Sequence, residues 1–110
     1  MLACVDVQYT ADSAVAACIL FQSWNDECST SQMVTHIKNI QPYQPGSFYA
    51  RELPCILSVL NKAPVLPDAV VIDGYVWLGN TKAPGLGAYL YFSLHERVPV
   101  IGVAKSRFQG

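Results

Sequence analysis

The chain has 110 residues, of which 52% are hydrophobic and 14% are charged, and its formal net charge is −1. This length fits a single domain, the hydrophobic fraction excludes a disordered chain, and no apolar run reaches the ~18 residues of a membrane-spanning helix. The N-terminal segment lacks the basic region of a signal peptide, so we expect a cytoplasmic protein without a membrane partner. Its four cysteines form no C-x-x-C pair, which gives no indication of a disulfide framework or a zinc site.

Apolar residues alternate or cluster along the first part of the chain in the manner of β-strands. The pattern predicts strands over residues 2–9, 14–24 and 32–40, separated by short polar turns. Three such strands in succession favour an antiparallel meander. Residues 41–46, Gln-Pro-Tyr-Gln-Pro-Gly, then predict a loop stiffened by its two prolines.

The second part of the chain alternates helices with strands. Helical spacing of apolar residues predicts helices over 47–61 and about 86–97, and short apolar runs predict strands over 69–72 and 98–103. The order β-β-β-α-β-α-β predicts an α/β fold with a mixed sheet, because strands that alternate with helices pair in parallel. No closing helix follows the last strand, so we expect residues 1–110 to form one truncated domain with an incompletely covered sheet.

Three acidic residues stand in apolar surroundings, unlike the other five, which lie in polar turns or near a helix end. Asp6 interrupts a strand, Asp73 ends another, and Glu52 lies in the first half of a largely apolar helix. Burying an unpaired carboxylate costs several kcal/mol, and one Mg²⁺ could compensate all three. The alternatives stay open at this point: Asp6 could face solvent, Asp73 could belong to an ordinary turn, and Glu52 could favour the start of its helix.

The chain resembles the endonuclease V family, which has a ribonuclease H-like fold. The resemblance runs through four segments in order: Val5-Asp6-Val7, residues 42–54 (Pro-Tyr-Gln-Pro-Gly-Ser-Phe-Tyr-Ala-Arg-Glu-Leu-Pro), Val71-Ile72-Asp73-Gly74, and residues 98–105 (Val-Pro-Val-Ile-Gly-Val-Ala-Lys). The second and fourth are long and specific. The resemblance spans essentially the whole chain but only about half of an ordinary family member.

The resemblance implies a Mg²⁺-dependent endonuclease, with Mn²⁺ as a possible substitute, that cuts 3′ to inosine in DNA or RNA, in DNA repair or RNA processing. Asp6, Glu52 and Asp73 match the metal-binding carboxylates, and Lys105 matches a catalytic lysine near the scissile phosphate. We expect a monomer at full length, whereas the truncated chain could self-associate.

The resemblance also implies residues that contact nucleic acid. Tyr43 matches an aromatic wedge that separates the strands beside the lesion, on a loop formed with Pro42, Pro45 and Gly46. Gly74 and Gly87 match positions where the backbone approaches the flipped hypoxanthine base. Unstacking this base from its neighbours costs a few kcal/mol.

The chain departs from the family pattern after its third carboxylate. The family usually continues with Gly-His-Gly, a further histidine and a basic pair, whereas residues 74–82 here read Gly-Tyr-Val-Trp-Leu-Gly-Asn-Thr-Lys, and Tyr91 replaces a common helix histidine. His36 and His95 fit neither position, and we expect them on a strand surface and near a helix end. Two alternatives to the enzyme follow: a catalytically incomplete nucleic-acid-binding remnant, or a fragment without activity of its own.

Overall fold

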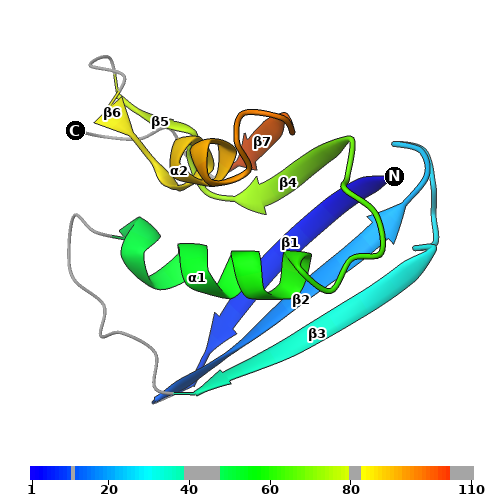
Figure 1. Ribbon diagram of the computed structural model, residues 1–110, viewed down its shortest axis with the longest axis horizontal. Coiled ribbons are helices and arrows are strands. Elements are labelled where there is room, and N and C mark those ends of the chain that lie inside the picture. The colour runs from blue at the N-terminus through cyan, green and yellow to red at the C-terminus, as the bar shows by residue number, and fades with distance from the viewer. Residues whose placement is uncertain (11, 39–47, 80–82, 105–110) are drawn as a thin grey trace.

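The protein forms a mixed five-stranded sheet with two helices packed against it. The computed structural model describes the chain except for residues 11, 39–47, 80–82 and 105–110. Along the sheet the strands follow the order β3-β2-β1-β4-β7 (Figure 1). Their bounds are Leu2–Tyr9 for β1, Ser13–Phe21 for β2, Ser31–Lys38 for β3, Ala69–Asp73 for β4 and Val100–Val103 for β7.

The pairing directions divide the sheet into two parts. β2 pairs antiparallel with both β1 and β3, as the short polar turns predict. β4 pairs parallel with β1 on one side and with β7 on the other. The prediction of an α/β fold with a mixed sheet, a meander followed by a parallel portion, is therefore confirmed.

Both helices lie on the same face of the sheet (Figure 1). α1 spans Phe48–Leu60 and α2 spans Leu86–Ser93. The side chains that alternate toward this face form the core, which is why Ala16 and Val5 are buried while their strand neighbours are less so. Fully buried alanines on β2 leave room for α1 to approach closely. Within the described residues, no helix is long and apolar enough to cross a membrane.

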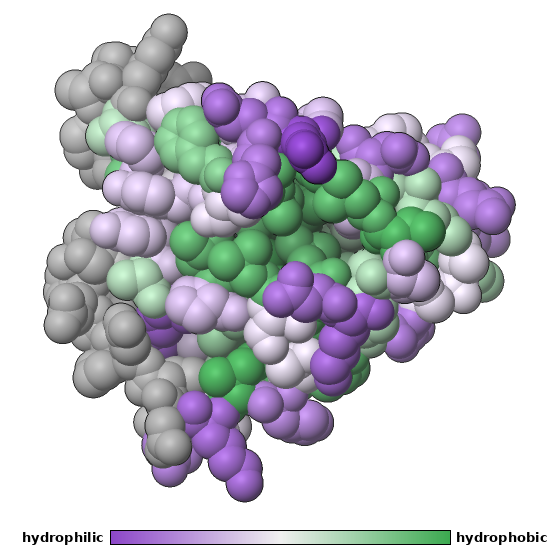
Figure 2. Space-filling model, in the orientation of Figure 1, coloured by the Kyte–Doolittle hydropathy of each residue, from purple (hydrophilic) through white to green (hydrophobic). Residues whose placement is uncertain are grey.

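The helix-bearing face exposes some hydrophobic side chains. Figure 2 shows hydrophobic side chains reaching the surface in the middle of this face, with hydrophilic side chains around them. Val65 and Leu66, which lie between α1 and β4 in the chain, are 52% and 60% exposed. Within the described residues, no helix or strand covers the opposite face of the sheet.

Two predicted boundaries are wrong because polar groups and backbone conformation end the elements early. β2 stops at Phe21 rather than at residue 24, since the Asp26 carboxylate accepts hydrogen bonds from the N–H groups of Gln22 and Ser23 and forms a turn. α2 stops at Ser93 rather than at residue 97, since the backbone enters the left-handed region at His95 (φ 59°) and at the residue after it (φ 58°).

The last strand also begins later than predicted, at Val100 rather than at residue 98. Val98 is only 1% exposed and belongs to the core. Pro99 has no N–H for the ladder, although its carbonyl accepts a hydrogen bond from the N–H of Val70 at 2.9 Å. Backbone pairing therefore starts just before the strand itself.

A small hairpin between β4 and α2 was not predicted. It consists of β5 (Trp77–Leu78) and β6 (Ala83–Pro84), which pair antiparallel. The hairpin packs tightly on the start of α2, because a Cβ added to Gly87 would lie 2.6 Å from Cγ2 of Val76. Gly87 thus permits a close approach that a side chain would prevent.

Candidate active site

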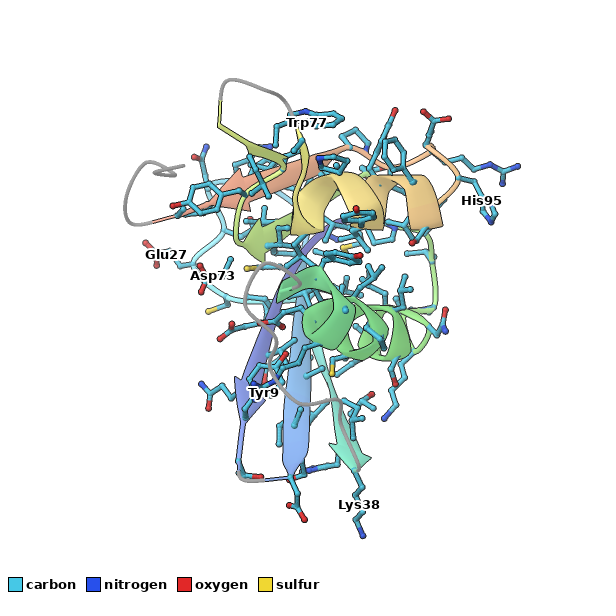
Figure 3. The ribbon with its side chains drawn as sticks, turned by 90° about the vertical axis from the view of Figure 1, so that its left-hand side faces the viewer. Tyr9, Glu27, Lys38, Asp73, Trp77 and His95 are labelled. Carbon is cyan, nitrogen blue, oxygen red and sulfur yellow. The ribbon has the colours of Figure 1, made fainter. Side chains whose placement is uncertain are left out.

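Three carboxylates from three different elements line one cavity. Asp6 comes from β1, Glu52 from α1, and Asp73 is the last residue of β4 (Figure 3). The parallel register pairs Val5 with Ile72, so Asp6 and Asp73 occupy the next position on neighbouring strands. Together with Glu52 they line a cavity of about 50 Å³, whose other walls are apolar: Val5, Val7, Ile56 and Leu86.

Glu52 is the most buried of the three carboxylates. Its side chain is 8% exposed, and it is the one charged residue among the buried residues of the described chain, whereas Asp6 and Asp73 are exposed. Burial raises the pKa of the Glu52 carboxyl, and the negative charges of Asp6 and Asp73 raise this pKa further. Contact with Tyr9 and the charge of Arg51 lower it, without reversing the overall direction.

Tyr9 and Arg51 form a pair beside Glu52. The Arg51 guanidinium carbon lies 3.6 Å from the centroid of the Tyr9 ring, a cation–π contact. The Tyr9 hydroxyl and the Nε of Arg51 are buried without a hydrogen-bond partner in the described structure. Burial and the neighbouring Glu52 carboxylate raise the pKa of the Tyr9 hydroxyl, although its approach to Glu52 falls short of regular hydrogen-bond geometry.

The three carboxylates have no basic partner among the described residues. The salt bridge found there joins the N-terminal ammonium to Asp68 at 2.7 Å, just before the first residues of β1 and β4, whereas Asp73 is the last residue of β4. Arg51 points its charge over Tyr9 instead. Carboxylates that crowd one cavity without compensation create a strongly negative site.

The chemistry of this site fits a hydrated divalent cation. Carboxylate oxygens are the ligands that Mg²⁺ favours, and Mg²⁺ usually keeps several waters. Within the described residues, no three His, Cys, Asp or Glu side chains lie together closely enough to hold a metal ion. The cavity of about 50 Å³ does have room for water, which needs at least ~10–15 Å³. Asp6, Glu52 and Asp73 are the described residues whose chemistry suits such an ion, and their side chains would have to draw together to hold it, with waters filling the remaining positions.

The two glycines expected near a base occupy tight backbone positions at the edge of the site. Gly74 follows Asp73 with a φ of 155°, which residues with a side chain rarely adopt, and its N–H donates to the carbonyl of Val103 at 2.9 Å. The N–H of Gly87 donates to the carbonyl of Tyr75 at 3.0 Å. Neither glycine lines the cavity with the carboxylates.

Several predicted site residues fall outside the described part of the chain. These are Pro42, Tyr43, Pro45, Gly46 and Lys105.

The two histidines lie away from the carboxylates, as expected. His36 is exposed on β3 and His95 is exposed just after α2.

Sequence reasoning missed the aromatic residues around the site. Tyr9 shares the alternating face of β1 with Val5 and Val7, which was a signal that its ring would point toward α1. Nothing in the sequence pattern indicated that the rings of Tyr49 and Tyr89 stack with centroids 3.9 Å apart and so join α1 to α2.

Comparison with known proteins accounts for the arrangement. The family model described as Endonuclease V matches residues 1–110. The chain is 32% identical to "Endonuclease V" of Nostoc punctiforme over 107 residues, which cover 96% of this chain and 47% of that protein. It is 33% identical to "Endonuclease V" of Dehalococcoides mccartyi over 115 aligned positions, which cover all of this chain and 48% of that protein.

Solved structures show the same fold. The crystal structure of endonuclease V from Streptomyces avermitilis superimposes with a TM-score of 0.79 at 31% identity, over 96% of this chain and 45% of that one. The catalytic domain of human endonuclease V superimposes with a TM-score of 0.77 at 24% identity, over 98% and 46%. The predicted ribonuclease H-like fold is therefore confirmed. The chain spans about half the length of the relatives it matches, and across that span it belongs to the endonuclease V family.

Proposed function

We propose that the protein is an endonuclease that hydrolyses a phosphodiester bond 3′ to inosine in DNA or RNA, with Mg²⁺ as its metal ion. The observation that carries the proposal is the cavity lined by Asp6, Glu52 and Asp73, three carboxylates without a basic partner in the described structure. Membership of the endonuclease V family supports the choice of reaction.

The three carboxylates would divide the work of holding the ion. Glu52 is buried and fixed on α1, so it provides an immobile ligand at the base of the site. Asp6 and Asp73 are exposed at adjacent strand positions, where they face arriving substrate. When bound there, Mg²⁺ activates water and offsets phosphate charge. The apolar walls at Val5 and Ile56 limit solvent on the protein side of the cavity.

The remaining assignments follow the family resemblance. Lys105 would provide a positive charge at the phosphate next to the cut. The loop with Pro42, Tyr43, Pro45 and Gly46 would insert its aromatic ring beside the lesion, because two prolines make the loop stiff enough to separate bases. The backbone at Gly74 and Gly87 would approach the displaced base. The expected products are a 3′-hydroxyl and a 5′-phosphate, one nucleotide beyond inosine.

A second candidate function is nucleic-acid binding without cleavage. It is favoured by the segment that follows Asp73, where residues 74–79 read Gly-Tyr-Val-Trp-Leu-Gly and carry no histidine or basic residue. In that case the carboxylate cavity would be inherited without a reaction.

Cleavage of labelled oligonucleotides that contain a single inosine separates the two candidates. The substrates are single-stranded and duplex DNA and the matching RNA, each with an adenosine control, assayed with Mg²⁺, with Mn²⁺ and with EDTA. Asp73→Asn removes one charge at constant size, and Glu27→Gln is the matched control, because Glu27 is exposed in the turn between β2 and β3.

The nuclease predicts a cut one nucleotide past inosine that needs the metal, disappears in Asp73→Asn and persists in Glu27→Gln. A folded protein that binds the inosine strands but cuts none of them would leave the binding function standing. Equal cutting by Asp73→Asn and the unaltered protein would contradict the assignment of the cavity.

A further inference from the structure

Two large aromatic side chains meet on the surface of the hairpin and the helix that follow Asp73 in the chain. Trp77 of β5 and Phe92 of α2 are each 47% exposed. Their rings pack edge to face, with centroids 6.5 Å apart and an interplanar angle of 67°. A third ring, that of Tyr91, lies 6.1 Å from Phe92. Exposed aromatic faces of this size are more typical of binding surfaces than of ordinary solvent-facing positions.

The chain ties this aromatic pair closely to Asp73. Trp77 follows Asp73 by four positions, so their Cα atoms are at most about 14 Å apart, at no more than ~3.6 Å per residue. The hairpin, the carboxyl end of β4 and the start of α1 lie on the same side of the molecule (Figure 1). Figure 3 shows Trp77 near the top of the view beside α2, above Asp73.

The hairpin holds Trp77 in a defined position. The N–H of Gly85 donates to the carbonyl of Val76 at 2.9 Å, which fixes the residue next to Trp77. Val76 also packs directly on Gly87, since a Cβ added there would lie 2.6 Å from Cγ2 of Val76. A fixed aromatic surface loses little conformational entropy when a flat ligand stacks on it.

We propose that Trp77, held edge to face against Phe92, stacks on an unpaired base of the substrate strand, a few nucleotides from the scissile phosphate. This inference rests on the proposed nuclease function and adds a preference for substrates that are single-stranded or locally opened at that position. Aromatic rings bind any base through its π-face, so the contact contributes affinity without reading sequence. The carboxylate site contacts the backbone at the cut, and the aromatic pair would hold the strand beside it.

Position, rather than exposure alone, distinguishes this pair. Trp24, 58% exposed, packs edge to face on Phe21 in much the same way, with centroids 5.8 Å apart at 70°. Phe21 pairs with Leu2 at the far end of β1 from the site, whereas Asp6 pairs with Ala17. Trp24 therefore provides a matched control: the same residue type in the same kind of contact, remote from the carboxylates.

The test measures how tightly the full-length protein binds a fluorescein-labelled single-stranded inosine oligonucleotide, by anisotropy in Ca²⁺. We expect Trp77→Ala to weaken this binding about tenfold, in the lower half of the range for loss of one stacked base. Trp77→Phe should retain most of the affinity, and Trp24→Ala should retain all of it. The Trp77→Ala change should weaken binding of a fully paired duplex less than it weakens binding of the single strand.

A second readout does not depend on cleavage. In Trp24→Phe, Trp77 is the one remaining tryptophan of the two in the sequence, so its fluorescence should be quenched by the single strand. A 5-iodouracil placed within a few nucleotides of inosine should photocrosslink to Trp77. Melting temperatures near that of the unaltered protein would show that the variants are folded.

The outcomes separate the stacking surface from the nuclease. Inosine-specific cutting with equal single-strand affinity in Trp77→Ala and the unaltered protein would overturn the stacking proposal and leave the nuclease intact. Trp77-dependent binding without cutting would support stacking and refute the nuclease. If Trp77→Ala changed only the oligomeric state in light scattering, the pair would serve contacts between copies, and the stacking proposal would be wrong.

Discussion

Replacing Glu52 with glutamine separates what this side chain contributes to stability from what it contributes to function. The carboxylate is 8% exposed, and its raised pKa means that the folded chain disfavours the charged form. A buried charged or polar group without full compensation costs about 1–3 kcal/mol. Glutamine keeps polar atoms in the same place but no charge, so we take the lower part of that range, about 1 kcal/mol, as the gain in the free energy of unfolding.

Such a gain should be visible in thermal unfolding. A change of about 1 kcal/mol moves the melting temperature of a domain of this size by roughly 4 °C or slightly more. In EDTA, Glu52→Gln should therefore melt above the unaltered protein by that amount, and Glu27→Gln, which alters an exposed carboxylate, should not differ. Differential scanning calorimetry at neutral pH gives the three values.

Addition of Mg²⁺ should reverse the order. A ligand that binds only the folded state at 100 times its Kd adds about 2.7 kcal/mol of stability. The unaltered protein and Glu27→Gln should gain this increment, and Glu52→Gln should lose most of it together with cleavage. A Glu52→Gln melting temperature below that of the unaltered protein in EDTA would refute the reasoning about the buried charge. Equal stabilisation of both proteins by Mg²⁺ would refute the assignment of Glu52 as a ligand.

Three further predictions concern pH and packing. The folded pKa of Glu52 is raised above its ordinary value of 4.5, so folding favours the protonated form. In EDTA the stability difference between Glu52→Gln and the unaltered protein should therefore be absent below pH 4.5 and grow as the pH rises through the folded pKa. Urea titrations from pH 4 to 7 measure this difference, and a difference that shrinks as the pH rises would contradict the prediction. Leu90→Ala should lower the free energy of unfolding by about 2–5 kcal/mol, since Leu90 is fully buried. Leu66→Ala, at a position 60% exposed, should change it by about 0.5 kcal/mol or less. Similar urea midpoints for the two variants would contradict the placement of Leu90 in the core. Gly87→Ala should lower the free energy of unfolding by about 1–3 kcal/mol, because the added methyl group overpacks against Val76. The same change in an open helix raises it by up to about 1 kcal/mol. A higher melting temperature for this variant would show that Val76 moves aside at little cost.

The elements that could be predicted are those whose apolar pattern and tertiary environment agree. The alternation along β1 and β3 and the helical spacing along α1 placed these elements within a residue or two. The hairpin of β5 and β6 could not be predicted, because two-residue strands carry no period. The end of α2 was missed for a different reason: His95 adopts a left-handed conformation that glycine usually occupies, so the usual stop signal is absent from the sequence.

The candidate site could also be predicted only in part. Asp6 and Asp73 could be singled out from sequence as acids in apolar strands, whereas the parallel register that makes them neighbours is seen in the structure. The contact between Arg51 and Tyr9 could not, because it depends on how α1 packs across β1. Acids in apolar surroundings can be recognised from sequence, whereas the contacts between the elements that carry them need the structure.

That unpredicted contact explains how the carboxylates remain available. Arg51 is adjacent to Glu52 in the chain and could neutralise it in a direct ion pair, which would stabilise the fold at the expense of cation binding. Its guanidinium instead lies 3.6 Å from the centre of the Tyr9 ring, where the cation–π contact holds it in place. From there its charge lowers the pKa of Glu52 but does not cancel the effect of burial and of the two aspartates. The ring of Tyr9 therefore keeps the positive charge close enough to make the buried carboxylate tolerable, without a direct ion pair between Arg51 and Glu52.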